Sequence, residues 1–205
     1  TNQLAMRLAR EEGSARRNRV EAQVQSLVNG MVIDAINDIA QAGGGYVQPH
    51  ATAATLRVLP LYPAMPSDWG GVTPDFEIPA DAAEVIATEF VDKPAYNRVF
   101  VGGLGAGVFG PWTRRGTAGD RIAPPVSHAL ITHADAQRQR AMAVLGDTGK
   151  QALVSLRMQV RPDTGVIVPG QFVRHGGVVG LVRSTAIDWQ RPTLRQVIQM
   201  ETHDA

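Results

Sequence analysis

Three glycines in the middle of the chain have the spacing of a phosphate-binding turn. They are Gly105, Gly107 and Gly110, which spell G-x-G-x-x-G after an apolar run typical of a strand. A dinucleotide-binding turn needs a helix that begins inside the motif, because the first amide groups of that helix contact the pyrophosphate. Pro111 follows instead, and the next amphipathic helix is predicted only near Thr132. The motif therefore predicts a flexible loop or a close approach of two backbones, and no cofactor site.

Two histidines and one aspartate lie close together and have the donor atoms of a metal site. They are His128, His133 and Asp135. Spacings of five and two residues do not place all three side chains on one helix face. Thr132 followed by Asp135 fits a capping box at the start of a helix. We therefore expect structural or surface roles for these residues, and no metal.

A hydrolase reading starts from the adjacent residues Ser127 and His128. Neighbours in an extended chain point to opposite faces, so they cannot form a nucleophile and base pair. The chain also has no G-x-S-x-G motif. Carboxylate pairs made by Asp163 or Asp188 with Glu201 depend on the fold and stay open. The sequence thus predicts no catalytic residue and no enzyme.

Three tryptophans stand beside polar or glycine-rich neighbours, at Trp69, Trp112 and Trp189. Such residues are either partly buried in a core or anchors of an interface. We expect Trp69 and Trp112 to lie at an interface.

Composition bounds the class of protein. The 205 residues are 44% hydrophobic and 19% charged, with a net charge of +1, which is typical of a folded domain without general attraction to nucleic acid or anionic membranes. The absence of cysteine excludes disulfides, thiolate metal sites and a cysteine nucleophile. No window approaches the roughly 18 apolar residues of a membrane span. The chain begins with Thr1, so either an initiator methionine was removed or the chain is a piece of a longer one.

Helical periodicity is clearest from Asn18 to Ala42, where apolar residues recur at three- and four-residue steps. The triple glycine 43–45 ends this helix. The arginine-rich stretch before it predicts a solvated or partner-facing surface. A second, short helix is predicted from the cap at Thr132 to Gly146.

The remaining segments read as β structure. Frequent prolines after residue 45 favour edge strands and loops, with strand-like pieces at Val85–Phe90 and Arg98–Val101. From Leu153 onward, "ALVSLRMQV", "VIVPGQFV", "VVGLVR" and "LRQVIQMET" predict strands. Pro169 and Gly170 predict a tight turn, and Gly180 a close approach to a neighbouring strand.

The predicted fold class is α+β. It comprises a long N-terminal helix, a proline- and glycine-rich mixed β segment, a short helix and a small C-terminal β-barrel-like region that the helix plugs. The expected domains are a helical segment at 1–45, a β-rich segment with long loops at 46–125, and the short helix with the small β-barrel at 126–205.

The order of the later segments resembles a known family. The segments are "AYNRVFVGG", "RRGTAGD", "ITHADAQRQRAMAVLGDTGKQALVSLRMQV", "VIVPGQFVRHGGVVGLVRS" and "RPTLRQVIQMETH". Together with "INDIAQAGGGYVQPHATAATLRVLPLYP" upstream, they resemble the C-terminal half of tail hub proteins of long-tailed bacteriophages, including Mu-like phages and related siphophages. The resemblance covers roughly residues 30 to 205.

This resemblance implies a structural virion protein of the tail tip or baseplate, assembled in the host cytoplasm. It implies a homo-oligomer, a trimeric ring, that contacts the tail tube, the tape-measure protein and distal tail or fibre proteins. DNA would pass through the ring without sequence-specific binding, and no membrane span is expected. Hubs of this type are longer, with another barrel-forming half before the helix. The alternatives are a head–tail connector, neck or other minor tail protein, which would form rings of six or twelve, and a tail-associated hydrolase.

Overall fold

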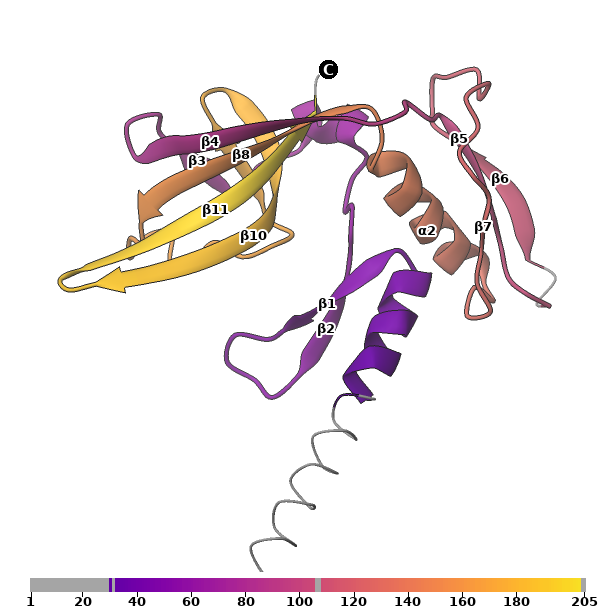
Figure 1. The fold of residues 1–205 in the computed structure, drawn as a ribbon, viewed down its shortest axis with the longest axis horizontal. Coiled ribbons are helices and arrows are strands. Elements are labelled where there is room, and N and C mark those ends of the chain that lie inside the picture. The colour runs from indigo at the N-terminus through magenta and orange to yellow at the C-terminus, as the bar shows by residue number, and fades with distance from the viewer. Residues whose placement is uncertain (1–29, 31, 106–107, 204–205) are drawn as a thin grey trace, which may run out of the picture. The chain divides into compact units, whose positions relative to one another are not determined.

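The computed structural model describes residue 30 and residues 32–105 and 108–203 (Figure 1). The chain divides into two compact units, residues 1–39 and 40–205. Within the described residues, β-sheets predominate and two α-helices accompany them, so the predicted α+β class is confirmed. None of the helices in this part of the chain has the length and apolar character needed to cross a membrane.

The first helix is described at residue 30 and residues 32–42. Its predicted start at Asn18 and the arginine-rich stretch before it lie outside the described residues. The helix ends before the triple glycine, as predicted, and Gly44 has a φ of +69°. A Cβ on Gly44 would lie 2.8 Å from the Cβ of Ala143, so glycine also permits close packing against the second helix.

A short hairpin follows this turn. Strands β1 (Gly45–Pro49) and β2 (Leu56–Pro60) pair antiparallel. The side chains of Tyr46 and Gln48 each donate a hydrogen bond of 3.0 Å to the carbonyl of Pro169. These bonds attach the hairpin to the loop around Pro169.

The largest element is a six-stranded sheet with the order β3-β9-β10-β11-β8-β4. Its strands are β3 (Phe76–Ile78), β4 (Ala83–Asp92), β8 (Lys150–Gln159), β9 (Phe172–His175), β10 (Val178–Gln190) and β11 (Thr193–His203). All neighbours are antiparallel except β3 and β9, which are parallel. Within the described residues β3 and β4 are opposite edges and do not pair, so the expectation of a closed barrel is wrong and the sheet is open.

One face of this sheet covers the main core. Alternate residues of β8 and β11, such as Leu156 and Ile198, are fully buried there, because successive side chains of a strand point to opposite faces. Ile167 is also fully buried, and its N–H donates to the side chain of Gln196 at 3.0 Å. The predicted strand "VIVPGQFV" is therefore only partly right. Its first half is an irregular segment that fills the core, and Gly170 turns the chain at a φ of +90° before β9 begins.

A second cluster is built by a three-stranded sheet and the short helix. The sheet has the order β6-β5-β7, from β5 (Arg98–Gly102), β6 (Phe109–Thr113) and β7 (Val126–Ser127), and the helix is α2 (Ala134–Gly146). Val99 and Val101 of β5 pack against Ala141 and Leu145 of α2. Buried Gln137 donates to the carbonyl of Val101 at 2.6 Å. The expectation that this helix plugs a barrel is wrong, because its apolar residues face β5 instead.

The N-cap of α2 differs from the predicted one. His133 occupies the cap position, and its Nδ1 accepts a hydrogen bond from the N–H of Asp135 at 3.3 Å. Thr132, the predicted cap, precedes it by one residue. The imidazole nitrogen of His133 thus accepts from a backbone N–H in the first turn of the helix, as the hydroxyl of a threonine at the cap position would.

Gly180 provides the first test, because β10 and β11 approach each other closely there, as predicted. A Cβ at this position would lie 2.6 Å from the carbonyl oxygen of Glu201 and would overlap the side chain of Met200. We expect Gly180→Ala to lower the free energy of unfolding by about 1–3 kcal/mol, measured by urea denaturation. The matched control is Gly70→Ala, where a Cβ would meet nothing within 4 Å. Equal stability of the two variants would contradict the close approach.

Candidate interaction surface

Two of the three glycines of the G-x-G-x-x-G motif lie in a hairpin. Gly105, with a φ of +77°, lies in the loop between the antiparallel strands β5 and β6. Gly110 lies within β6 itself, and Gly107 lies outside the described residues. A strand therefore follows the motif where a dinucleotide site needs a helix.

The two histidines of the candidate metal cluster accept hydrogen bonds from backbone amides. Nδ1 of His128 accepts from the N–H of Leu130 at 3.2 Å, and His133 caps α2. Among the residues that the structure describes, no group of three or more histidine, aspartate or glutamate side chains could hold a metal ion.

The candidate carboxylate pairs do not meet. Asp188 stands opposite Arg195, whereas Glu201 stands opposite Leu181. Seven residues along β10 separate these two positions, about 23 Å at roughly 3.3 Å per residue. Asp163 forms an ion pair with Arg161 at 3.0 Å. Asp188 is therefore too far from Glu201 to share a reaction with it, and Asp163 is held by Arg161.

Glu201 instead lies at the centre of a buried ionic network. It is 4% exposed, and its Oε2 accepts from Nε of Arg183 at 2.6 Å. Its Oε1 accepts from the hydroxyl of Tyr62 at 2.8 Å and lies 2.6 Å from Nε2 of His203. Burial alone would raise the pKa of Glu201, but the hydrogen bonds from His203 and Arg183 outweigh it and lower the pKa from 4.5 to about 2.

An aromatic group encloses this network. Trp69 is 3% exposed and packs edge-on against His203 and Phe172, at centroid distances of 5.1 and 5.6 Å. The guanidinium of Arg183 lies 4.2 Å from the ring centroid of Tyr62, and burial raises the pKa of that tyrosine. The expected interface role of Trp69 is therefore wrong, because its indole belongs to the core.

The network holds the fold together and is unsuited to proton transfer. Both oxygens of Glu201 already have partners, and a carboxylate with a pKa of about 2 stays ionised at neutral pH. A general base works best with a pKa near the working pH. Sequence reasoning missed this cluster. Its only signal was the alternation of polar residues Gln199, Glu201 and His203 on one face of the last strand.

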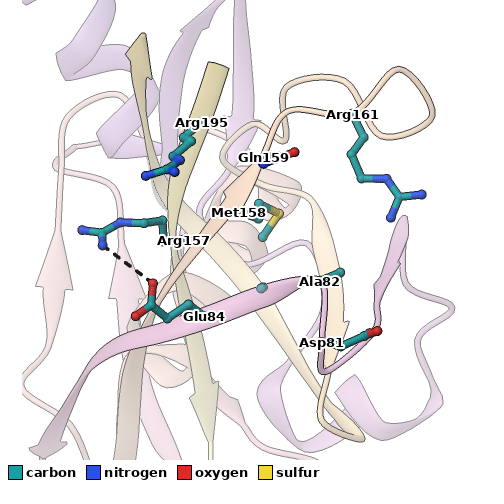
Figure 2. Close-up of a pocket in the computed structure, with 9 residues that line it drawn as sticks. Asp81, Ala82, Glu84, Arg157, Met158, Gln159, Arg161 and Arg195 are labelled. Carbon is teal, nitrogen blue, oxygen red and sulfur yellow. Dashed lines mark ion pairs between the residues drawn. The ribbon is translucent and has the colours of Figure 1, made fainter. Parts of the chain in front are cut away.

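A hollow of about 490 Å³ lies at one end of the six-stranded sheet. In Figure 2, Glu84 of β4 reaches toward Arg157 of β8, with Arg195 of β11 beside them and Arg161 on the following loop. Nη1 of Arg157 lies 3.7 Å from the Glu84 carboxylate. Because three arginines line this hollow, it is a candidate binding site for an anion.

The charges around the hollow argue against such a site. Asp81 and Glu84 line it, Asp163 pairs with Arg161, and Asp188 stands opposite Arg195. The two lining carboxylates and the two aspartates beside Arg161 and Arg195 leave no net positive charge around the hollow to attract a phosphate. The hollow is a mixed-charge surface of the kind found at the rim of protein interfaces.

Two apolar regions of the same sheet are exposed. The first is the β4 edge, residues 83–92, where Phe90 is 82% exposed. The second is the β10–β11 arm, residues 184–197, where Trp189 is 66% exposed. Contiguous apolar residues at a surface mark contacts with other molecules. Trp112, by contrast, is half-buried against the α2 cluster.

Comparisons with known proteins give matches of fold only. No family model and no curated protein matches the sequence. A tail protein from Neisseria meningitidis is 12% identical with a TM-score of 0.49, over 83% of this chain and 54% of that one. The 43 kDa tail protein of prophage MuSo2 from Shewanella oneidensis is 14% identical with a TM-score of 0.40, over 77% and 48%. A prophage tail protein from Listeria monocytogenes is 13% identical with a TM-score of 0.42, over 76% and 48%. The chain thus spans about half the length of these structures.

The Glu201 network predicts a specific loss of stability in acid. The lowered pKa stabilises the folded state above the ordinary value of 4.5, and this contribution is lost as the pH falls toward 2. A pKa of about 2 instead of 4.5 corresponds to about 3 kcal/mol. We expect Glu201→Gln to be less stable than the original chain at neutral pH, because buried Arg183 loses its counter-ion. The gap should narrow as the pH falls from about 5 to about 2.

Urea denaturation across this pH range measures the gap. The matched control is Asp163→Asn, which removes an exposed ion pair that contributes little. A gap between Glu201→Gln and the original chain that stays constant with pH would contradict the assigned role of Glu201.

Proposed function

We propose that this chain is a structural component of a bacteriophage-type tail, located at the hub or tail tip. The observation that carries the proposal is the exposure of long strand edges with large apolar side chains, Phe90 on the β4 edge and Trp189 on the β10–β11 arm. An unpaired apolar strand is a hazard in a solitary protein and an advantage in an assembly.

The resemblance in segment order indicates which assembly this chain would belong to. It covers roughly residues 30–205 and points to the C-terminal half of tail hubs. The proposal rests on this resemblance and on the exposed strands, not on the structural matches, whose TM-scores are below 0.5. The buried Glu201 network, closed around its carboxylate, favours a structural role over a hydrolase.

The proposed assembly is a trimeric ring in the virion. Its neighbours would be the tail tube and tape-measure protein on one side and distal tail or fibre proteins on the other. A ring of six or twelve would instead indicate a head–tail connector or neck protein. DNA would pass through the ring without being bound, and the balanced charges at the hollow suit a surface that does not retain a polyanion.

The first test is the composition of tail particles. An antibody against this chain, used for gold labelling in electron microscopy of intact particles, is expected to mark the distal end of the tail. Protein quantification of purified tails is expected to give three copies per tail. Labelling at the head–tail junction, or absence of the chain from washed particles, would contradict the proposal.

The second test concerns DNA. We expect the purified chain to show no binding to duplex DNA tighter than the roughly 10⁻⁴–10⁻⁶ M typical of non-specific contacts, measured by fluorescence anisotropy at physiological salt. The matched variant Glu84→Gln with Asp81→Asn removes two carboxylates from the hollow, and binding should strengthen. Tight binding by the original chain would contradict a passive channel surface.

A further inference from the structure

Besides the three-residue edge strand β3, the open sheet has two longer stretches of strand edge with no neighbour among the described residues. β4 pairs with β8 on one side only, along all of residues 83–92. β10 pairs with β9 only through Leu181, and the backbone of Gln171 bonds Val182, so the edge beyond Arg183 is free. Each free edge presents a row of unpaired N–H and C=O groups that can accept a further strand.

The directions of these two edges are compatible. In the order β10-β11-β8-β4 each strand is antiparallel to the next, so β4 runs opposite to β10. A second copy placed beside β4, in the same orientation, would present its own β10 antiparallel to β4. The faces also agree, because the two copies would share one core side and one outer side of a continuous sheet.

Apolar residues would then meet on one side. Phe90 is paired with Ala152, and Ile187 with buried Gln196, positions that point to the core side of the sheet. Ile187 is 54% exposed, and Trp189 points to the same side two residues later. Cross-strand contacts between aromatic and β-branched side chains are among the more favourable pairs in a sheet.

Charge selects this pairing over a symmetric one. Residues 81–92 carry four acidic side chains and no basic one, namely Asp81, Glu84, Glu89 and Asp92. Pairing of β4 with β4 of a second copy would bring these carboxylates together, and like charges opposite each other are destabilising. The free edge of β10, residues 184–190, carries only one charged side chain, Asp188, which stands opposite Arg195 of β11, and Arg191 follows at the tip. This edge therefore lacks the cluster of carboxylates that makes β4 repel a second β4.

We propose that the β4 edge of one copy of this chain pairs with the free edge of β10, residues 184–190, of a second copy. This inference deepens the proposed function. The pairing itself is argued from the strand edges, and only its closure into a ring rests on the proposed function. The contact uses different surfaces on the two copies, so each copy keeps one edge free for the next. Such head-to-tail contacts close into a ring when the rotation between copies permits.

Cross-linking tests the pairing directly, because the chain has no cysteine. Ala87→Cys places a thiol on the β4 edge, and Ala186→Cys places one on the arm, both at exposed positions on the outer side. The two single variants, one of them tagged, are mixed and treated with a bis-maleimide of about 10 Å reach, which covers the roughly 7–8 Å between diagonal neighbours on paired strands. The expected product is the mixed dimer, in at least fivefold excess over either homodimer.

Other products overturn the proposal. Homodimers of Ala87→Cys alone would indicate β4 pairing with β4, and no cross-linked product would indicate that neither edge is used. Asp163→Cys, exposed on a loop, is the matched control and should give no product with either variant.

A surface variant tests the apolar contribution. Phe90→Asp in the Ala87→Cys background adds a fourth carboxylate to the β4 edge, residues 83–92, and removes the exposed ring. We expect a tenfold lower yield of the mixed dimer with an unchanged urea midpoint, because Phe90 is 82% exposed. An unchanged yield would overturn the pairing.

Failure of this inference is distinguishable from failure of the proposed function. A chain found at the tail tip without the mixed cross-link refutes the edge pairing alone. A chain that gives the mixed cross-link but is absent from tail particles refutes the tail function alone.

Discussion

The ionic contact between Glu201 and Arg183 joins parts of the chain that are far apart in sequence. Arg183 lies where the register of β10 and β11 shifts, and its second nitrogen donates to the carbonyl of Leu61 at 2.6 Å. Glu201 accepts the hydroxyl of Tyr62, the next residue in that segment. Tyr62 in turn packs so closely on Gly146, the last residue of α2, that a Cβ there would lie 2.6 Å from its ring. One buried carboxylate thus connects the main sheet, the crossing segment and the end of the short helix.

This arrangement covers the outer face of the sheet at one end and leaves that face open at the other end. Tyr62 and Trp69 cover the outer face beside Glu201, whereas the outer face near Arg157 and Arg195 is open. The sheet does not curl into a barrel that would satisfy its own edges. Among the described residues it keeps two long free strand edges, of the kind that can pair with another chain.

Much of the architecture could be predicted from the sequence because local signals decide it. The capping signal and Gly146 located α2, the alternation of apolar residues located β8 and β11, and the positive φ of Gly170 marks the predicted turn. The failures concern long-range choices. The residues around Trp69 in the sequence do not show whether its indole lies in a core or at an interface. Local sequence also does not show whether a sheet closes into a barrel or stays open. Both Thr132 and His133 have a side-chain acceptor that can cap a helix. His133 is the cap because the helix begins one residue later than predicted, at Ala134.

The central claim is that this protein acts through strand edges that other chains cover. Hydrogen–deuterium exchange of the backbone amides of β4, compared between the free chain and assembled tail particles, tests it most directly. The outward-facing amides of residues 83–92 are expected to exchange rapidly in the free chain and slowly in the particle, while those of β11 stay protected in both. Equal exchange of the β4 amides in both states would contradict the claim.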